Sequence, residues 1–201
     1  IQSRLPRFLG PPRPPDKTKR AMVVEKLQTI FDRGYVVLPS SKDFIQSLMD
    51  FFEVDKGITD IRLVYNGTSC GLNDTVWAPN FWLPTPSTAA RVLGFGYYMV
   101  DIDLGGMFLN FPLPSLLQKL SGVDLRHFAS EMGDAMKNSA ARGNYRVPWT
   151  QCWMGLKPSP FMAVRFYYLA EEFARGNRHE KKNPMRWDCV VLNLPGDPKY
   201  D

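Results

Sequence analysis

The stretch Gly96-Tyr-Tyr-Met-Val-Asp-Ile-Asp103 alternates between two sets of side chains, as a strand of a partly buried sheet does. Asp101 and Asp103 are two residues apart, so both carboxylates leave the same face of that strand. Two carboxylates on one face repel each other unless a cation lies between them, and oxygen ligands suit Mg²⁺. The pair is therefore a candidate metal site, with a solvated strand edge as the alternative.

Upstream of this strand, the sequence predicts two helices. Apolar residues recur at helical spacing over residues 17–33, and Gly34 follows at the position that commonly ends a helix. Ser40 or Ser41 can cap a second helix. The buried stripe of that second helix would consist of Phe44, Ile45 and Leu48.

Two shorter strands are expected between those helices and the aspartate pair. Residues 51–56 and 61–65 are rich in aromatic and apolar side chains, and Gly57 lies between them, which is typical of a hairpin. The Pro-, Trp- and Asn-rich stretch 73–86 should be irregular. Four aromatic side chains could stack on bases, but core packing is favoured for most of them: Trp77, Phe81, Trp82 and Trp153.

Downstream of the aspartates, the patterns predict further helices. Two helical patterns follow Pro112, and the better one would bury Leu125, Phe128, Met132 and either Ala135 or Met136. Ser159 and Pro160 form a helix start for residues 161–174. The apolar face of this last helix would consist of Phe161, Val164, Tyr168 and Leu169.

The order of these elements indicates the fold class. Residues 144–153 should be extended, and a polar loop should lead to a last strand over 187–194. Helices and strands are interspersed without the regular spacing of βαβ units. The expected class is therefore α+β, with helices packed on a small antiparallel sheet.

Composition restricts the class of protein. The 201 residues carry 25 Lys+Arg against 20 Asp+Glu, a net charge of +5 that is compatible with nucleic acid without requiring it. With 44% hydrophobic residues the chain should fold. It contains no uninterrupted run of about 18 apolar residues, so no transmembrane helix is predicted. Three scattered cysteines exclude a disulfide framework and a zinc knuckle. The Pro- and Arg-rich residues 1–20 should form an extended linker, with a phosphate-binding arm as the alternative.

The residues that follow the aspartates carry a family resemblance. In Asp103-Leu-Gly-Gly-Met-Phe108-Leu-Asn-Phe-Pro112, an aromatic and a proline follow an aspartate by five and nine residues. This segment resembles the palm motif of the reverse transcriptase family. The resemblance implies that Asp103 and the carbonyl of Leu104 bind metal, in a two-Mg²⁺ arrangement that activates the primer 3′ hydroxyl and stabilises the leaving pyrophosphate. Phe108 would leave no room for a 2′ hydroxyl, which implies deoxynucleotide substrates, and Asp101, outside the family spacing, is the runner-up ligand.

A second block, residues 60–74, resembles the fingers motif of the same family, nearest to its Pao-like versions. The resemblance implies that Arg62, with Lys56 on the preceding strand, holds the triphosphate of the incoming nucleotide. An arginine offers a bidentate fork for such a group and a lysine a point charge. Asn66 stands where the family has an aspartate, and Asn73 is expected to contact template or primer.

A third block, residues 149–160, resembles the next motif of the family. Gly155 would let the backbone approach the template and nucleotide closely. Met154 would border the nucleotide pocket, and Lys157 would contact phosphate or template.

One family motif is missing from the sequence. The aromatic-x-Asp-Asp hairpin should follow the helix after Gly155, and no Asp-Asp occurs in the 201 residues. Asp188 is a weak degenerate candidate, and the preferred interpretation is an insertion with the hairpin beyond Asp201. The chain reads as a fragment: an arm over 1–20, a fingers-like region over 21–95, and a partial palm over 96–201 with an insertion after about residue 175. Alone it should be inactive or nearly so.

The functional expectation is therefore a fragment of an RNA-directed DNA polymerase. Its partners would be an RNA or DNA template, a DNA primer, deoxynucleoside triphosphates and two Mg²⁺ ions, with no membrane. No signal peptide is indicated, so the nucleus, the cytoplasm and an element particle all fit. Two alternatives stay open: a non-catalytic nucleic-acid-binding descendant of the polymerase fold, and a viral RNA-dependent RNA polymerase, which Phe108 disfavours.

Overall fold

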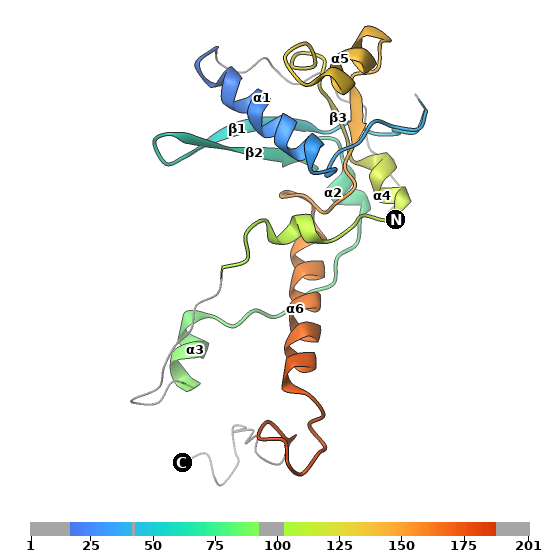
Figure 1. The fold of residues 1–201 in the computed structure, drawn as a ribbon. Coiled ribbons are helices and arrows are strands. Elements are labelled where there is room, and N and C mark those ends of the chain that lie inside the picture. Colours follow the sequence, from blue (N-terminus) through green and yellow to red (C-terminus); the bar gives the residue numbers. More distant parts are fainter. Residues whose placement is uncertain (1–16, 42, 93–102, 188–201) are drawn as a thin grey trace. The chain divides into compact units, whose positions relative to one another are not determined.

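A computed structural model describes residues 17–41, 43–92 and 103–187 (Figure 1). The chain divides into two compact units, residues 1–163 and 164–201, and the boundary falls within helix α6 (Ser159–Arg175). The first unit contains both two-stranded antiparallel sheets of the described part, together with the helices that precede and separate them. At this coarse level the predicted α+β class is confirmed.

The first sheet is the hairpin of β1 (Asp50–Lys56) and β2 (Asp60–Asn66), close to where the sequence predicts it. Its turn contains Gly57, whose φ of +71° suits glycine best. The register places Lys56 opposite Asp60 and Val54 opposite Arg62. Because cross-strand partners share a face, these four side chains lie on one face of the hairpin, and the opposite face buries Phe51, Ile61 and Tyr65.

Helix α1 (Lys17–Asp32) packs against this hairpin and matches the predicted first helix. Val23 and Leu27 are its buried anchors, and Gly34, with φ +70°, follows its end. Two ion pairs also join the helix to the hairpin, Lys19 to Asp55 and Lys26 to Asp60. Figure 1 shows α1 lying across the hairpin.

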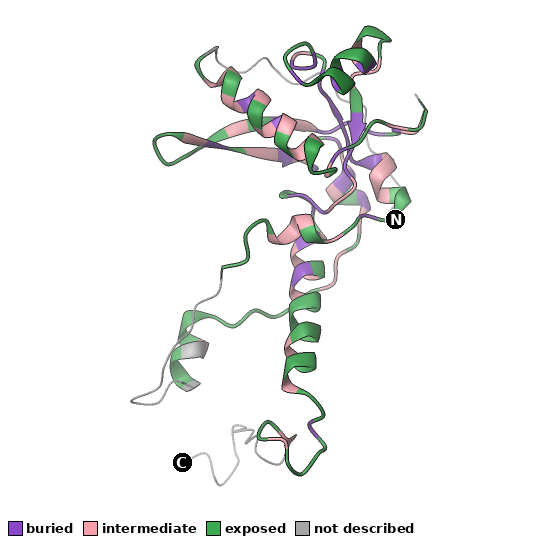
Figure 2. Cartoon of the chain, in the orientation of Figure 1, coloured by how far each residue is buried: buried purple, intermediate pink, exposed green. Residues whose placement is uncertain are grey.

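The second sheet pairs β3 (Gly122–Asp124) with β4 (Arg146–Pro148). Strand β4 lies inside the predicted extended stretch 144–153, whereas β3 was not predicted. Helix α4 (Ser115–Leu120) precedes β3, and helix α5 (Asp134–Ala141) lies between the two strands in the chain. The hairpin and the second sheet both contribute to one hydrophobic core, whose buried residues are purple in Figure 2. Its largest members are Trp149, Trp153 and Phe128.

The predicted second helix, from Ser40 or Ser41, is wrong. Of the segment before β1, the described residues 43–49 contain no helix. The N–H of Gln46 donates to the carbonyl of Lys119, and the N–H of Met49 donates to that of Gly122. Ile45 and Leu48 are buried as expected, but in an extended chain whose hydrogen bonds go to distant residues rather than to the next turn.

The predicted helix over residues 125–136 is also wrong in its first part. Residues 125–133 form successive turns, and helix α5 begins only at Asp134. The N–H groups of Phe128 and Ala129 both donate to the Leu125 carbonyl, and that of Glu131 donates to Phe128, so three-residue steps are mixed with a single α-helical turn that does not continue. The side chains at the predicted positions are nevertheless buried: Leu125, Phe128, Met132 and Met136.

Helix α6 confirms the predicted helix over 161–174, but not its predicted apolar face. Leu169 is 62% exposed and Tyr168 is also exposed. Phe161 and Val164 are half-buried, so within the described residues the predicted face is partly buried at the start of the helix and exposed further along it. The expected strands over 96–103 and 187–194 lie outside the described residues except for their end residues Asp103 and Trp187.

Three short elements complete the described part. Helix α2 (Leu72–Thr75) follows the hairpin, an irregular stretch leads to helix α3 (Pro86–Val92), and the 3₁₀ turn η1 (Met107–Asn110) follows Asp103. Core packing holds for Trp153 but not for Trp77, which is 74% exposed, and not for Phe81 and Trp82, which are exposed as well. These three lie in the proline-rich stretch, where no strand or helix carries them into the core.

Candidate functional site

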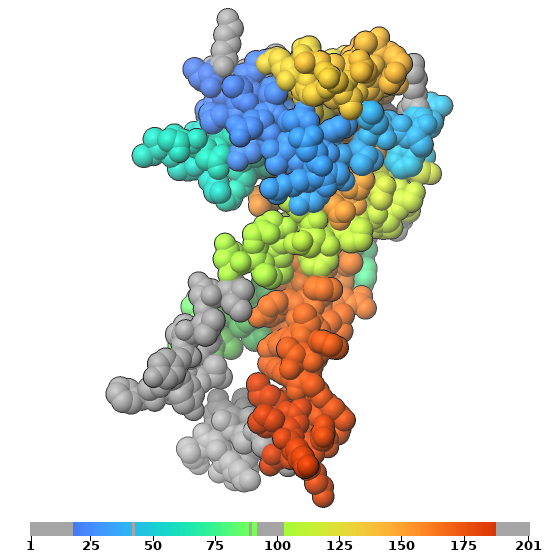
Figure 3. All heavy atoms as spheres, in the orientation of Figure 1, coloured from blue at the N-terminus to red at the C-terminus, as the bar shows by residue number. Residues whose placement is uncertain are grey.

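A cavity of about 600 Å³ lies between α1, the hairpin and the segment 103–109. Trp149 and Met154 complete its wall. In Figure 3 the hairpin overhangs the segment that follows Asp103, and a notch separates them. This volume is in the range of pockets that bind small molecules and cofactors.

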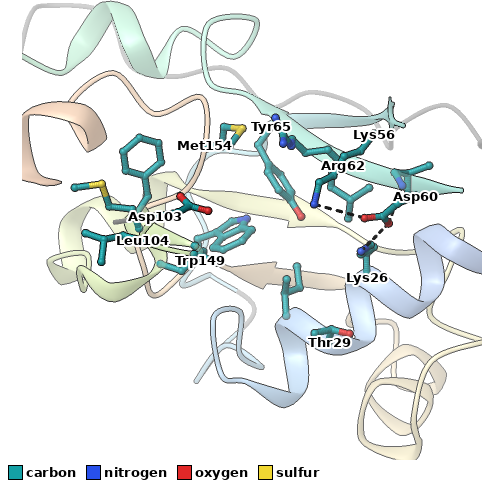
Figure 4. Close-up of a pocket in the computed structure, with 18 residues that line it drawn as sticks. Lys26, Thr29, Lys56, Asp60, Arg62, Tyr65, Asp103, Leu104, Trp149 and Met154 are labelled. Atoms are coloured by element: carbon teal, nitrogen blue, oxygen red, sulfur yellow. Dashed lines mark hydrogen bonds and ion pairs between the residues drawn. The ribbon is translucent and has the colours of Figure 1, made fainter. Parts of the chain in front are cut away.

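One side of the cavity carries the residues of the palm-like block. Asp103 is exposed at the rim, and Figure 4 shows it with Leu104 on the side opposite the hairpin. Within the described part of the chain, no hydrogen bond or ion pair engages the Asp103 carboxylate. Phe108, in η1, lines the same cavity and packs partly against the core. The carboxylate is therefore accessible to a cation.

The other side of the cavity carries the cations of the hairpin. Lys56 and Arg62 are both exposed and both line the cavity. Lys56 Nζ lies 3.7 Å from Asp60 Oδ2, whereas the Arg62 guanidinium has no hydrogen-bond or ion-pair partner among the described residues. A guanidinium without a partner is available for an anionic ligand.

Asp60 is the carboxylate on this side, and it is engaged. Lys26 Nζ of α1 lies 2.9 Å from Asp60 Oδ1, and the N–H of Ile61 donates to the same oxygen at 2.8 Å. The hydrogen bond from Lys26, followed by that from the Ile61 backbone, lowers the pKa of Asp60. Asp60 is therefore ionised at neutral pH and holds two ammonium groups near the rim.

The inner wall consists of Tyr65 and Trp149, whose rings meet edge to face at 4.9 Å between centroids. Figure 4 shows both between the Asp103 side and the cationic side. The Tyr65 hydroxyl and the Trp149 indole N–H are buried and have no partner among the described residues. Burial raises the pKa of Tyr65, so the hydroxyl stays protonated. Two buried donors thus remain unpaired beside the cavity.

Replacing Tyr65 by phenylalanine tests whether this hydroxyl is unpaired. Removing an unpaired buried hydroxyl should leave the free energy of unfolding unchanged or raise it by about 0–1 kcal/mol, because a buried polar group without a partner is destabilising. Urea unfolding of Tyr65→Phe beside the wild type measures this. A loss of more than about 1 kcal/mol would mean that the hydroxyl has a partner in solution.

The loop after Trp153 is attached to helix α2 by Asn73. Its side-chain N–H donates to the Gly155 carbonyl at 2.8 Å, and its Oδ1 accepts the N–H of Lys157 at 2.9 Å. Gly155 has φ +109°, and a Cβ there would lie 2.1 Å from the carbonyl oxygen of Tyr65. Both ends of the Asn73 amide are therefore used within the chain, while the side chain of Lys157 is exposed.

Asn66, which stands at the family's aspartate position, closes the turn after β2. Its Oδ1 accepts the backbone N–H groups of Thr68 and Ser69, at 3.2 and 3.0 Å. An amide oxygen makes such a turn as well as a carboxylate does. The local contact of this residue is thus with its own backbone turn.

The structure brings six of the sequence-predicted site residues to one cavity. They are Lys56, Arg62, Asp103, Leu104, Phe108 and Met154. Asn73, Gly155 and Lys157 lie together in the adjoining loop contact instead. The sequence did not indicate three further cavity residues: Lys26, Tyr65 and Trp149. Lys26 has the pattern of an ordinary surface lysine on a helix, and Tyr65 and Trp149 have the pattern of ordinary core residues.

The fit of the site to Mg²⁺ rests on Asp103. An exposed carboxylate without a partner in the described residues can supply one oxygen ligand, and Mg²⁺ commonly keeps waters and substrate phosphates as its others. In the part of the chain that the structure describes, no group of three or more His, Cys, Asp or Glu side chains could hold a metal ion. Asp101, the runner-up ligand, lies outside the described residues.

The chain matches no family model and no curated protein sequence. Among the described residues, no helix is both long enough and apolar enough to cross a lipid bilayer.

Proposed function

We propose that this chain is the fingers and the first part of the palm of a reverse transcriptase, an RNA-directed DNA polymerase. The full enzyme extends a DNA primer on an RNA or DNA template by two-metal nucleotidyl transfer. One observation carries the proposal: a free carboxylate, Asp103, faces the cations Lys56 and Arg62 across a single cavity of about 600 Å³. The three sequence blocks described above support it further.

The charges of the cavity suit a metal-bound triphosphate. A triphosphate brings about four negative charges. The Arg62 guanidinium and the Lys56 ammonium would compensate part of that charge by hydrogen bonds and ion pairs. Asp103 would supply an oxygen ligand to Mg²⁺, whose chemistry there would be to activate the attacking hydroxyl and to stabilise charge on the leaving group. Asp60 is engaged by its two lysine partners.

The walls of the cavity suit the sugar and base. Phe108 lines the cavity on the Asp103 side, where its ring would exclude a 2′ hydroxyl. Met154, Tyr65 and Trp149 offer apolar surface for the rest of the nucleotide. Catalysis by this chain requires the missing Asp-Asp hairpin, because one carboxylate does not hold two metal ions.

Discrimination between dATP and ATP tests this function directly. In the presence of Mg²⁺, the 201-residue chain should bind dATP about tenfold more tightly than ATP, since a close apolar wall discriminates by this order. Phe108→Ala should bring the two affinities to within about twofold, because the ring that excludes the hydroxyl is gone. Calorimetric titration measures both affinities.

Phe52→Ala is the matched control, because Phe52 is an exposed aromatic of the hairpin that does not line the cavity. It should keep the dATP preference. Tighter binding of ATP by the wild type would favour an RNA polymerase instead. Binding of single-stranded nucleic acid without binding of either nucleotide would favour the non-catalytic descendant.

A further inference from the structure

Lys26 is a cation of the cavity that no sequence motif indicates. It lies on α1 and lines the cavity, and its side chain is 41% exposed. Its Nζ reaches Asp60 Oδ1 at 2.9 Å, and Lys56 Nζ reaches the other oxygen of the same carboxylate at 3.7 Å. One carboxylate therefore brings ammonium groups from two different elements to the same rim (Figure 4).

The ion pair does not use up the binding capacity of Lys26. An ammonium group has three donors, and Asp60 takes one of them. The remaining donors of a partly exposed ammonium can reach a phosphate oxygen in the cavity. Asp60 keeps its charge because its pKa is lowered, so it continues to hold Lys26 at neutral pH.

We propose that Lys26 is a third cationic ligand for the triphosphate, beside Lys56 and Arg62, and that Asp60 positions it. The inference rests on the proposed function, because it assumes that a nucleoside triphosphate enters this cavity. With Lys26 included, the side of the cavity opposite Asp103 carries three cations and one carboxylate, Asp60, which is paired with lysines. The balance of charge there is positive, as a polyanion requires.

The alternative role of Lys26 is to attach α1 to the hairpin. The same helix and hairpin are joined by a comparable pair outside the cavity. Lys19 Nζ of α1 lies 2.7 Å from Asp55 Oδ1 of β1, and Lys19 is not among the described residues that line the cavity. Both pairs join the same helix to the same hairpin and are partly exposed. Lys19→Gln is therefore the control for Lys26→Gln.

Binding of Mg²⁺-dATP and of inorganic tripolyphosphate by the 201-residue chain tests the proposal. Lys26→Gln should weaken both about tenfold, because a charge-assisted hydrogen bond to phosphate is lost. Lys26→Arg should stay within about threefold of the wild type and Lys19→Gln within about twofold. Thermal unfolding of each variant shows that it is folded.

A second measurement uses the wild-type chain alone. Acylation of lysine amines, followed by mass spectrometry, should slow at Lys26 about tenfold when tripolyphosphate is bound, and should not slow at Lys19. This readout does not depend on the folding of any variant.

Each outcome decides something different. Equal weakening by Lys26→Gln and Lys19→Gln, or no weakening and no protection at Lys26, overturns this inference and leaves the proposed function in place. If the wild type binds neither Mg²⁺-dATP nor tripolyphosphate, the proposed function and this inference are overturned together.

Discussion

Gly155→Ala is expected to lower the free energy of unfolding by about 3–5 kcal/mol. The φ of +109° at Gly155 is one that side chains rarely adopt, and the added Cβ would lie 2.1 Å from the Tyr65 carbonyl oxygen. That oxygen belongs to the backbone of β2. Because Tyr65 is paired with Phe51 of β1, the strand cannot easily move away from the added Cβ. Relief of the clash would also move the Gly155 carbonyl from Asn73. Urea unfolding measures the loss.

Gly143→Ala is the control for this change. Its φ is +79°, but no atom lies within 4 Å of the added Cβ, so only the backbone conformation is unfavourable. The expected loss is about 1–2 kcal/mol. If both variants lose the same free energy, the close approach of Gly155 to β2 does not exist in solution.

Asp103→Asn is expected to weaken Mg²⁺-dATP binding about 100-fold, because a metal ligand is lost while the shape of the side chain is kept. The proposed metal site has no other free carboxylate in the described residues that line the cavity. Stability should change by less than about 0.5 kcal/mol, since Asp103 is exposed and has no partner among them. Titrations with and without Mg²⁺ measure the effect.

Asp74→Asn is the matched control, because Asp74 is an exposed aspartate of α2 that does not line the cavity. It should bind as the wild type does. If Asp103→Asn keeps the full Mg²⁺ dependence of dATP binding, Asp103 is not a metal ligand and the polymerase proposal loses its main support.

Local patterns predicted the elements that depend on neighbouring residues. Helix α1 ends before Gly34, and the hairpin turns at Gly57, because helical periodicity, strand alternation and a glycine at each end act within a few residues. Prediction failed where distant partners decide. Residues 43–49 resemble a helix in spacing, but their backbone bonds to Lys119 and Gly122, far along the chain.

The candidate site divides in the same way. Lys56, Arg62, Asp103 and Phe108 could be named from motif spacing, and the structure gathers them at one cavity. Lys26 could not be named, because a lysine on a helix surface has no local signature until the helix packs on a hairpin. The sequence positions of Tyr65 and Trp149 likewise indicate only that the two side chains are buried, and not that they line a cavity.

The amino-acid sequence by itself determined the α+β class, the hairpin, the first and last helices and the motif residues, because each depends on periodicity or spacing along the chain. Only the tertiary structure decided that Asp103 and Arg62 border the same cavity, that Asp60 holds two lysines, and that Gly155 has no room for a side chain. The reason is physical: apart from Lys56 and Asp60, which are cross-strand partners near the hairpin turn, these residues are tens of positions apart, and packing of the core brings them together.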